Sequence, residues 1–271
     1  MRIECKSLAK NIREQAKREA KGKKLYLHNI VVGEDEASLV YAKSNLKLLR
    51  KMGFDGKIHH LEEDEKILLR LIDSLNEDER VHGIMVNFPL PKNIDAMKVR
   101  ERILPIKDVD GINPLNYGKL LLGQEILVPN TPRAVIRILE KITELCGKDV
   151  LIINRTPVVG KPLLLLLLNR DATPTIAHSK TMNLEEKARN ADIIVVAVGK
   201  PGFLREDMVK EGAIVIDVGI NVVDGKIVGD ADFENIEKKA YITPVPGGVG
   251  TVTNACLIEN LVKAAKLQGV I

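Results

Sequence analysis

Short apolar runs alternate with amphipathic stretches along most of the chain. The runs are rich in Val, Ile and Leu and have the length of buried strands, at residues 25–32, 57–61, 81–88, 150–154, 173–179, 192–198, 213–218 and 240–245. Helical patterns fill most of the intervals between them. Because strands that alternate with helices build βαβ units, the pattern predicts an α/β fold on parallel sheets.

Two stretches interrupt this alternation. Residues 107–124 contain the turn-forming pairs Asp110-Gly111 and Asn113-Pro114 and show no helical period, so we expect a domain junction near them. Residues 243–250 are also irregular and precede a final apolar helix. We therefore predict a first lobe at residues 1–117, completed by a C-terminal helix at 250–271, and a second lobe of nucleotide-binding size at 118–249.

The composition excludes several classes of protein. The 271 residues are 45% hydrophobic and 29% charged, which is typical of a folded globular chain. Aromatic residues make up only 3%, and the net charge of +4 is modest, so no nucleic-acid partner is expected. No apolar run approaches the roughly 20 residues of a membrane span. Three widely spaced cysteines predict no metal pair and fit a reducing cytoplasm, where we expect the protein to act.

The most informative pattern in the second lobe runs from Asp149 to Pro162. It predicts strand, turn and helix, with Pro162 in the first helical turn, where its missing N–H has no intrahelical partner. The loop before it would direct free N–H groups and the positive end of the helix at a phosphate. Since only Gly160 of a GxGxxG pattern is present, a plain strand-to-helix turn fits as well.

The end of the next strand favours one dinucleotide over another. It lacks the acid that commonly binds the ribose 2′-hydroxyl of NAD, and Ser179 stands there instead. Ser179 and Arg155, from the preceding turn, could hold a 2′-phosphate through charge-assisted hydrogen bonds, which favours NADP. A surface arginine and a helix-capping serine are the alternative.

Four polar side chains of the first lobe are candidates for ligand contact. Tyr41 and Asn45 lie four residues apart on a predicted helix, so they share one face. Asn87 follows a buried strand, and ligand clefts of open α/β sheets form at that end. Asp110 lies in the irregular stretch. A structural interpretation stays open for Tyr41, which could pack on a loop, and for Asp110, which could shape a turn.

Nine segments spread over the chain match one family in order. They are Val32 to Ser38 with Tyr41, and residues 83–91, 107–111, 129–132, 158–162, 178–181, 217–221, 229–230 and 244–250. By these motifs the chain resembles the methylenetetrahydrofolate dehydrogenase/methenyltetrahydrofolate cyclohydrolase family. The resemblance implies two lobes around a cleft, folate between them, NADP on a Rossmann-like second lobe, and a homodimer formed through the nucleotide lobes.

The resemblance also implies a reaction and the residues that perform it. Hydride would pass from 5,10-methylenetetrahydrofolate to NADP, and water would open the methenyl product to 10-formyltetrahydrofolate. Tyr41 would stack on the folate and Asp110 would hydrogen-bond the pterin. The catalytic positions would be Tyr41, Asn45, Asn87 and Asp110, and the folate-binding positions Tyr41, Asn87, Asp110, Pro246, Gly247 and Gly248. The NADP-binding positions would be Asn154, Arg155, Thr156, Val159, Gly160, Lys161, Pro162, Ser179, Gly199 and Ile220.

Two linked site positions depart from the family. The family has a lysine four residues after the tyrosine, which serves the hydrolytic step, and a glutamine that partners it; this chain has Asn45 and Asn87. Lys43 and Lys47 lie roughly 200° and 240° around the helix from Tyr41, so neither simply substitutes. The redox residues are retained. For the hydrolytic step two alternatives stay open: the activity is lost, or a water held by the two asparagines restores it.

Two other functions fit parts of the pattern. A shikimate-type dehydrogenase, reducing a small keto acid, would share the two-lobe plan. A non-catalytic NADP-binding regulator would fit the replacement of two polar site residues. Turnover of a folate separates both from the leading interpretation.

Overall fold

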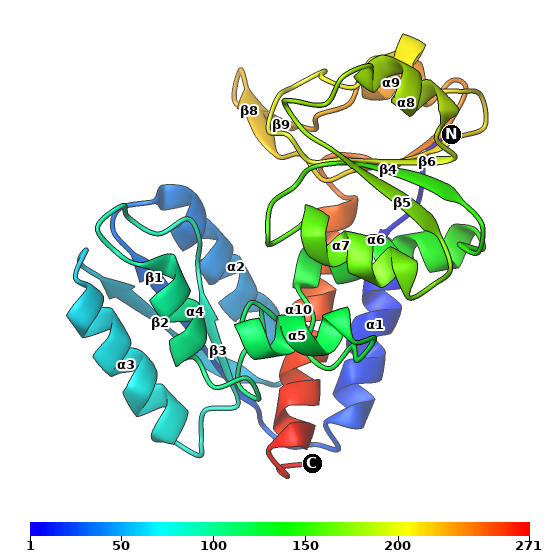
Figure 1. Cartoon of the computed structure of the whole chain (residues 1–271). Helices are drawn as coiled ribbons and strands as arrows, with labels where there is room; N and C mark the ends of the chain where they lie inside the picture. Colours follow the sequence, from blue (N-terminus) through cyan, green and yellow to red (C-terminus); the bar gives the residue numbers. More distant parts are fainter. The chain divides into compact units, whose positions relative to one another are not determined.

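The computed structural model describes all 271 residues, which form two compact units (Figure 1). Unit 1 comprises Met1–Lys10 and Thr131–Asn254, and unit 2 comprises Asn11–Asn130 and Ala255–Ile271. The expected junction at residue 117 lies inside helix α5 (Pro114–Leu121), whereas the chain changes unit after Asn130. Helices α1 (Lys6–Glu19) and α10 (Val249–Leu267) each contribute residues to both units.

Unit 2 contains a three-stranded parallel sheet in the order β2-β1-β3. Its strands are β1 (Tyr26–Val32), β2 (Asp55–Leu61) and β3 (Gly83–Val86). Its remaining helices are α2 (Glu36–Lys51), α3 (Glu65–Glu77) and α4 (Ala96–Arg102). Asp35, Asp64 and Asp95 fix where these three helices begin, because each carboxylate accepts backbone N–H groups of the first turn.

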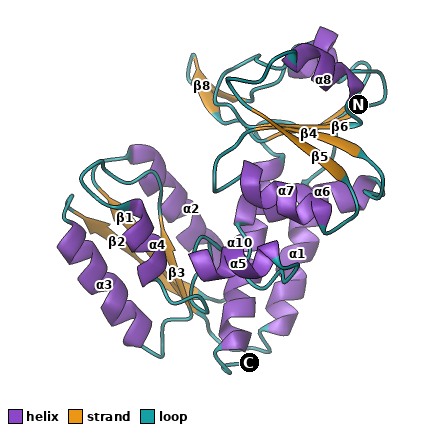
Figure 2. Ribbon diagram, in the orientation of Figure 1, coloured by secondary structure: helices purple, strands orange, loops and turns teal.

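Helices cover both faces of this sheet (Figure 2). Ile30 and Ile84 pack with α3 and α4 on one face. Leu27 and Met85 pack with α2 and with residues of α1 and α10 on the other. Since both faces are buried, the strands have continuous apolar runs rather than an alternating pattern, which is why the sequence predicts them well.

Unit 1 contains a five-stranded parallel sheet in the order β10-β7-β6-β4-β5. The strands are β4 (Asp149–Ile153), β5 (Thr173–Ala177), β6 (Ile193–Val196), β7 (Ile214–Asp217) and β10 (Tyr241–Ile242). Figure 1 shows α6 (Asn130–Ile142) and α7 (Gly160–Leu168) on one face, and α8 (Leu184–Asn190) and α9 (Phe233–Ile236) on the other. Because β5 and β6 flank β4, the order reverses there, and ligands of such sheets bind outside the carboxyl ends at that point.

All eight predicted strands are present, but one helix and one two-stranded hairpin were not predicted. Helix α5 lies in the stretch expected to have no helical period; it is only two turns long, and its start is set by Asn113, whose side chain accepts Leu115 N–H at 2.8 Å. The antiparallel hairpin β8 (Asn221–Val223) and β9 (Lys226–Val228) turns at Asp224-Gly225, both with positive φ. No helix is long and apolar enough to cross a bilayer.

Candidate functional site

Helix α2 places Tyr41 and Asn45 one turn apart in unit 2. Tyr41 is half-buried, and burial together with the charge of Asp110 raises the pKa of its hydroxyl, so the group stays protonated at neutral pH. Asn45 lies close enough to oppose this rise in pKa. Tyr41 and Asn45 of the helix and Asp110 of a later loop therefore lie in one neighbourhood.

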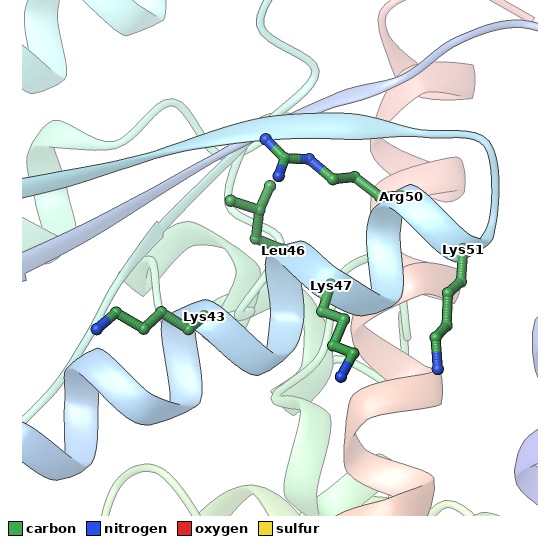
Figure 3. A pocket seen from close by; sticks show the side chains of 5 residues that line it. All are labelled: Lys43, Leu46, Lys47, Arg50 and Lys51. Atoms are coloured by element: carbon green, nitrogen blue, oxygen red, sulfur yellow. The ribbon is translucent and has the colours of Figure 1, made fainter.

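Asn45 is an uncharged side chain in a buried position. It is only 1% exposed, its Nδ2 lies 3.9 Å from Met85 Sδ, and its Oδ1 has no hydrogen-bond partner. Lys43 and Lys47 instead line an exposed pocket together with Leu46, Arg50 and Lys51 (Figure 3). This separation agrees with the helical angles and leaves no lysine of α2 beside Tyr41.

Asn87 directly follows the sheet at the carboxyl end of β3. It is 7% exposed, and its Nδ2 donates to Asn29 Oδ1 and to Ile30 O, both at 2.9 Å. Alternation along the strand puts Met85 and Asn87 on the same side of the sheet. Since β1 engages the donor end of the amide, the Asn87 Oδ1 acceptor is the end available to a ligand.

Asp110 is half-buried in the loop that follows α4. Its Oδ1 accepts a hydrogen bond from Asn130 Nδ2 at 2.9 Å. Burial and the neighbouring charge of Asp108 raise the pKa of Asp110 to about 7, against opposing effects of Asn130 and Arg100. The carboxyl group can therefore accept or carry a proton near neutral pH.

Two cations near this loop have structural contacts. Lys107 Nζ donates to the carbonyls of Leu75, Asn76 and Asp78 at 2.8–3.0 Å, where α3 ends. The Arg100 guanidinium lies over the Phe88 ring at 4.9 Å. Because the Lys107 ammonium is bonded to the carbonyls at the end of α3, it cannot substitute for a lysine at position 45.

In unit 1, the turn between β4 and α7 is organised by Asn154. Its Oδ1 accepts N–H groups from Thr156 at 2.8 Å and from Gly160 at 3.0 Å, and Lys161 N–H donates to Thr156 O at 3.1 Å. Pro162, next in the first turn, has no N–H. The expectation of free helix amides is therefore wrong at these positions, because an asparagine side chain and a loop carbonyl already engage them.

Gly160 is required by this turn, since an added Cβ would lie 2.1 Å from Asn154 O. Val159, directly before it, is half-buried and caps the helix without a side-chain hydrogen bond. Arg155, Thr156 and Lys161 are exposed around it. Polar side chains, rather than helix amides, therefore face solvent at this end of β4.

Arg155 and Ser179 follow two strands that end at the same edge of the sheet. Strands β4 and β5 are adjacent and parallel, and Ile153 is in register with Ala177, two residues before each candidate. Both side chains are exposed. The fold therefore places Arg155 and Ser179 just beyond the carboxyl ends of neighbouring strands.

Two aspartates missed by sequence reasoning organise the rest of this edge. Asp230 accepts N–H groups of Val198, Gly199 and Lys200 at 2.6–2.9 Å, so the amide of Gly199 is engaged. Asp217 accepts those of Gly219, Asp230 and Ala231 at 2.9–3.0 Å. The sequence carried a signal for both, because Gly219 leaves room for the Asp230 carboxylate and Gly229 leaves room for that of Asp217.

The remaining candidates lie on two loops of unit 1. Ile220 is 68% exposed, just before hairpin strand β8. Pro246, Gly247 and Gly248 lie between β10 and α10; Gly247 has φ +100°, and a Cβ on Gly248 would lie 2.3 Å from Pro244 O. Both glycines are therefore demanded by the loop itself.

Two family models together cover most of the chain. The tetrahydrofolate dehydrogenase/cyclohydrolase catalytic domain matches residues 3–110, and the NAD(P)-binding domain of the same family matches residues 129–269. The chain belongs to the tetrahydrofolate dehydrogenase/cyclohydrolase family. The predicted family, α/β fold and dinucleotide-binding second lobe are thereby confirmed.

Relatives in this family match over the full length. The chain is 48% identical to the bifunctional protein FolD of Bacillus pumilus, over 97% of each chain. It is 45% identical to the crystal structure of the bifunctional FolD enzyme of Campylobacter jejuni, covering 98% and 99% of the two chains with a TM-score of 0.94. The Trypanosoma brucei enzyme, complexed with NADP cofactor and inhibitor, is 35% identical over 100% and 99%, with a TM-score of 0.94.

The shikimate alternative has only a likeness of fold. Shikimate dehydrogenase of Aquifex aeolicus is 13% identical, with a TM-score of 0.56. Asn45 and Asn87 are thus departures within the tetrahydrofolate dehydrogenase/cyclohydrolase family rather than signs of membership in another one.

Proposed function

We propose that the protein is an NADP-dependent methylenetetrahydrofolate dehydrogenase. The observation that carries this is the grouping of Tyr41, Asn45 and Asp110 beside the carboxyl end of the β3 strand, in a chain 45% identical to an enzyme named methylenetetrahydrofolate dehydrogenase/cyclohydrolase. The reaction moves hydride from the methylene carbon to the cofactor and gives 5,10-methenyltetrahydrofolate.

Unit 2 supplies groups that suit a folate. The aromatic face of Tyr41 can stack on a flat ring, and its protonated hydroxyl remains a hydrogen-bond donor. Asp110 can accept from a pterin N–H when it is ionised. Because hydride transfer depends mainly on orientation, these residues act by holding the reacting carbon in place.

Unit 1 supplies groups that suit NADP, which provides the hydride acceptor when bound. The Arg155 guanidinium and the Ser179 hydroxyl at neighbouring strand ends match the donors that a 2′-phosphate requires. Since Asn154 and Thr156 engage the first amides of α7, the pyrophosphate depends on side chains of the turn, with Lys161 as the nearby cation.

We also propose that dehydrogenation outpaces hydrolysis in this family member. Hydrolysis needs proton management and charge stabilisation at the methenyl carbon. A buried, neutral Asn45 supplies no charge, and the lysines of α2 lie on its exposed face. The two asparagines retain amide groups that can hold water, which supports a slow second step.

The proposed assembly is a homodimer formed through the nucleotide-binding unit, in the cytoplasm. Hairpin β8–β9 supports this, because Val222 and Ile227, which pair across it, are 73% and 48% exposed. Apolar side chains grouped at one exposed element are typical of an interface. A two-fold axis would bury this element against its copy.

Initial rates test the function against its alternatives. Purified protein is supplied with 5,10-methylenetetrahydrofolate or shikimate, each with NADP or NAD, and reduced cofactor is followed. The proposal predicts turnover with the folate and faster turnover with NADP. Reduction only with shikimate, or NADP binding without any turnover, contradicts it.

A further inference from the structure

Asp110 is bonded by Asn130, and Asn130 is bonded in turn by Asn260 from a distant part of the sequence. Asn130 is the first residue of α6 and Asn260 lies on α10, and they are 2% and 1% exposed. All three residues belong to unit 2. The proposed function gives neither asparagine a role.

The hydrogen bonds between them have a defined direction. Asn260 Nδ2 donates to Asn130 Oδ1 at 3.0 Å and also to Val109 O and Val128 O, at 3.0 and 2.9 Å. With its oxygen engaged, the Asn130 amide must direct Nδ2 the other way, where it donates to Asp110 Oδ1 at 2.9 Å and to Val109 O at 3.1 Å. Helix α10 thereby fixes which end of Asn130 meets Asp110.

Burial of both amides indicates more than filling of space. A buried amide costs free energy unless its polar atoms are paired, and here Asn260 and Asn130 pair each other and the loop carbonyls. Neither side chain is exposed enough to meet a ligand itself. Their effect on a ligand must therefore pass through Asp110.

We propose that Asn130 and Asn260 are positioning residues that anchor Asp110 Oδ1 and leave Oδ2 to accept from the folate. This rests on the proposed function, which makes Asp110 the pterin contact. An anchored carboxylate has fewer orientations to lose when the folate binds, and the donated N–H favours its ionised form.

Other charged groups act on Asp110 from each element around it. Asp108 lies in the same loop and Arg100 on α4, and the Tyr41 and Tyr117 hydroxyls face it from α2 and α5. Cys256 of α10 acts on Tyr41. Replacing an asparagine changes none of these groups. A change in the pKa of Asp110 in such a variant is therefore caused by the loss of the asparagine.

The first test needs no substrate. Carbon-13 NMR of the full chain, labelled at the aspartate carboxyls and assigned with Asp110→Asn, follows the titration of Asp110 in wild type, Asn130→Ala and Asn260→Ala. Asn130→Ala is expected to move the midpoint up by about one pH unit, because a hydrogen bond to the carboxylate is lost. Asn260→Ala should move it in the same direction, and the double variant no further than Asn130→Ala alone.

Asn130→Ser covers the case in which Asn130→Ala does not fold. Its hydroxyl can accept from Asn260 and donate to Asp110, so the midpoint should return toward that of wild type. An unmoved midpoint in a folded Asn130 variant, or additive shifts in the double variant, overturns the proposal. Either result would leave the proposed function standing, because the titration is measured without folate or NADP.

Kinetics supply the second test. Asn130→Ala and Asn260→Ala should each raise KM for the folate about tenfold, shift its pH dependence as the NMR midpoint shifts, and leave KM for NADP unchanged. Asn76→Ala is the matched control, since that half-buried amide bonds Arg102 O and Leu104 N–H away from Asp110. An equal loss in the control, or loss of kcat with an unaltered pH profile, contradicts positioning.

Discussion

At Asp110, folding places a carboxyl group where burial and Asp108 favour its neutral form, with a pKa of about 7. The ionised group accepts a hydrogen bond from a pterin N–H more strongly than the neutral carboxyl group does. We therefore expect kcat/KM for the folate to rise with pH through about 7, and this rise to be absent in Asp110→Asn. A pH–rate profile with the same rise in the variant would assign the titration to another group.

The same group makes stability depend on pH in a defined direction. Its pKa is raised above the ordinary value of 3.8, so the folded state holds this proton between about pH 4 and pH 7 while the unfolded state has lost it. The contribution of Asp110 to stability therefore falls as pH rises through that window. The Tm of Asp110→Asn, relative to that of wild type, should therefore be higher at about pH 8 than at about pH 5. The same difference in Tm at both pH values contradicts this.

We expect Asn45 to set the balance between the two reactions. Asn45→Lys, combined with Asn87→Gln, is expected to raise the rate of methenyltetrahydrofolate hydrolysis about tenfold or more, because a cation returns beside Tyr41. Ser44→Lys adds the same charge on the exposed face of α2 and should leave hydrolysis unchanged. Equal effects of both lysines would show that net charge, rather than position, matters.

Arg155 is expected to set the preference for NADP over NAD. Removing a guanidinium that meets a 2′-phosphate removes a charge-assisted hydrogen bond, so Arg155→Ala should cut the NADP/NAD ratio of kcat/KM about tenfold or more. Arg189→Ala, an exposed arginine of α8 paired with Glu185, is the control. An unchanged ratio in Arg155→Ala removes Arg155 from the cofactor site.

At the scale of elements, hairpin β8–β9 is the part of the proposed dimer that can be tested. Val222→Glu puts a charge where two copies would bury an apolar surface, and sedimentation velocity should then show a monomer. Leu122→Glu makes a similar change at a 77% exposed leucine of unit 2 and should leave a dimer. A Val222→Glu dimer, or a wild-type monomer, contradicts the proposed interface.

Elements defined by local pattern could be predicted, and those defined by distant partners could not. The buried strands are continuous apolar runs, and α2 ends at Lys51, two residues before Gly53, whose φ of +83° is one that glycine allows. Helix α5 and the hairpin are too short for a period to emerge. The Asn130–Asn260 contact joins residues 130 positions apart, and Asn154 engages amides that a glycine would leave free, so neither has a local signal.

At the scale of the whole molecule, we expect each unit to bind one of the two reactants. Unit 2 presents Tyr41 and Asp110, which suit the folate, and unit 1 presents Arg155 and Ser179, which suit NADP. The departures Asn45 and Asn87 both lie in unit 2, so we expect them to affect folate chemistry and to leave the cofactor groups of unit 1 intact. A family member altered in this way is expected to keep oxidation and slow the hydrolysis that follows.

The most direct measurement is a time course of products from 5,10-methylenetetrahydrofolate and NADP, under conditions where spontaneous methenyl hydrolysis is slow. The account predicts one NADPH per folate oxidised, with 5,10-methenyltetrahydrofolate accumulating ahead of 10-formyltetrahydrofolate. Formation of 10-formyltetrahydrofolate at the rate of NADPH would contradict the role given to Asn45. The absence of NADPH would contradict the central claim that this chain is a methylenetetrahydrofolate dehydrogenase.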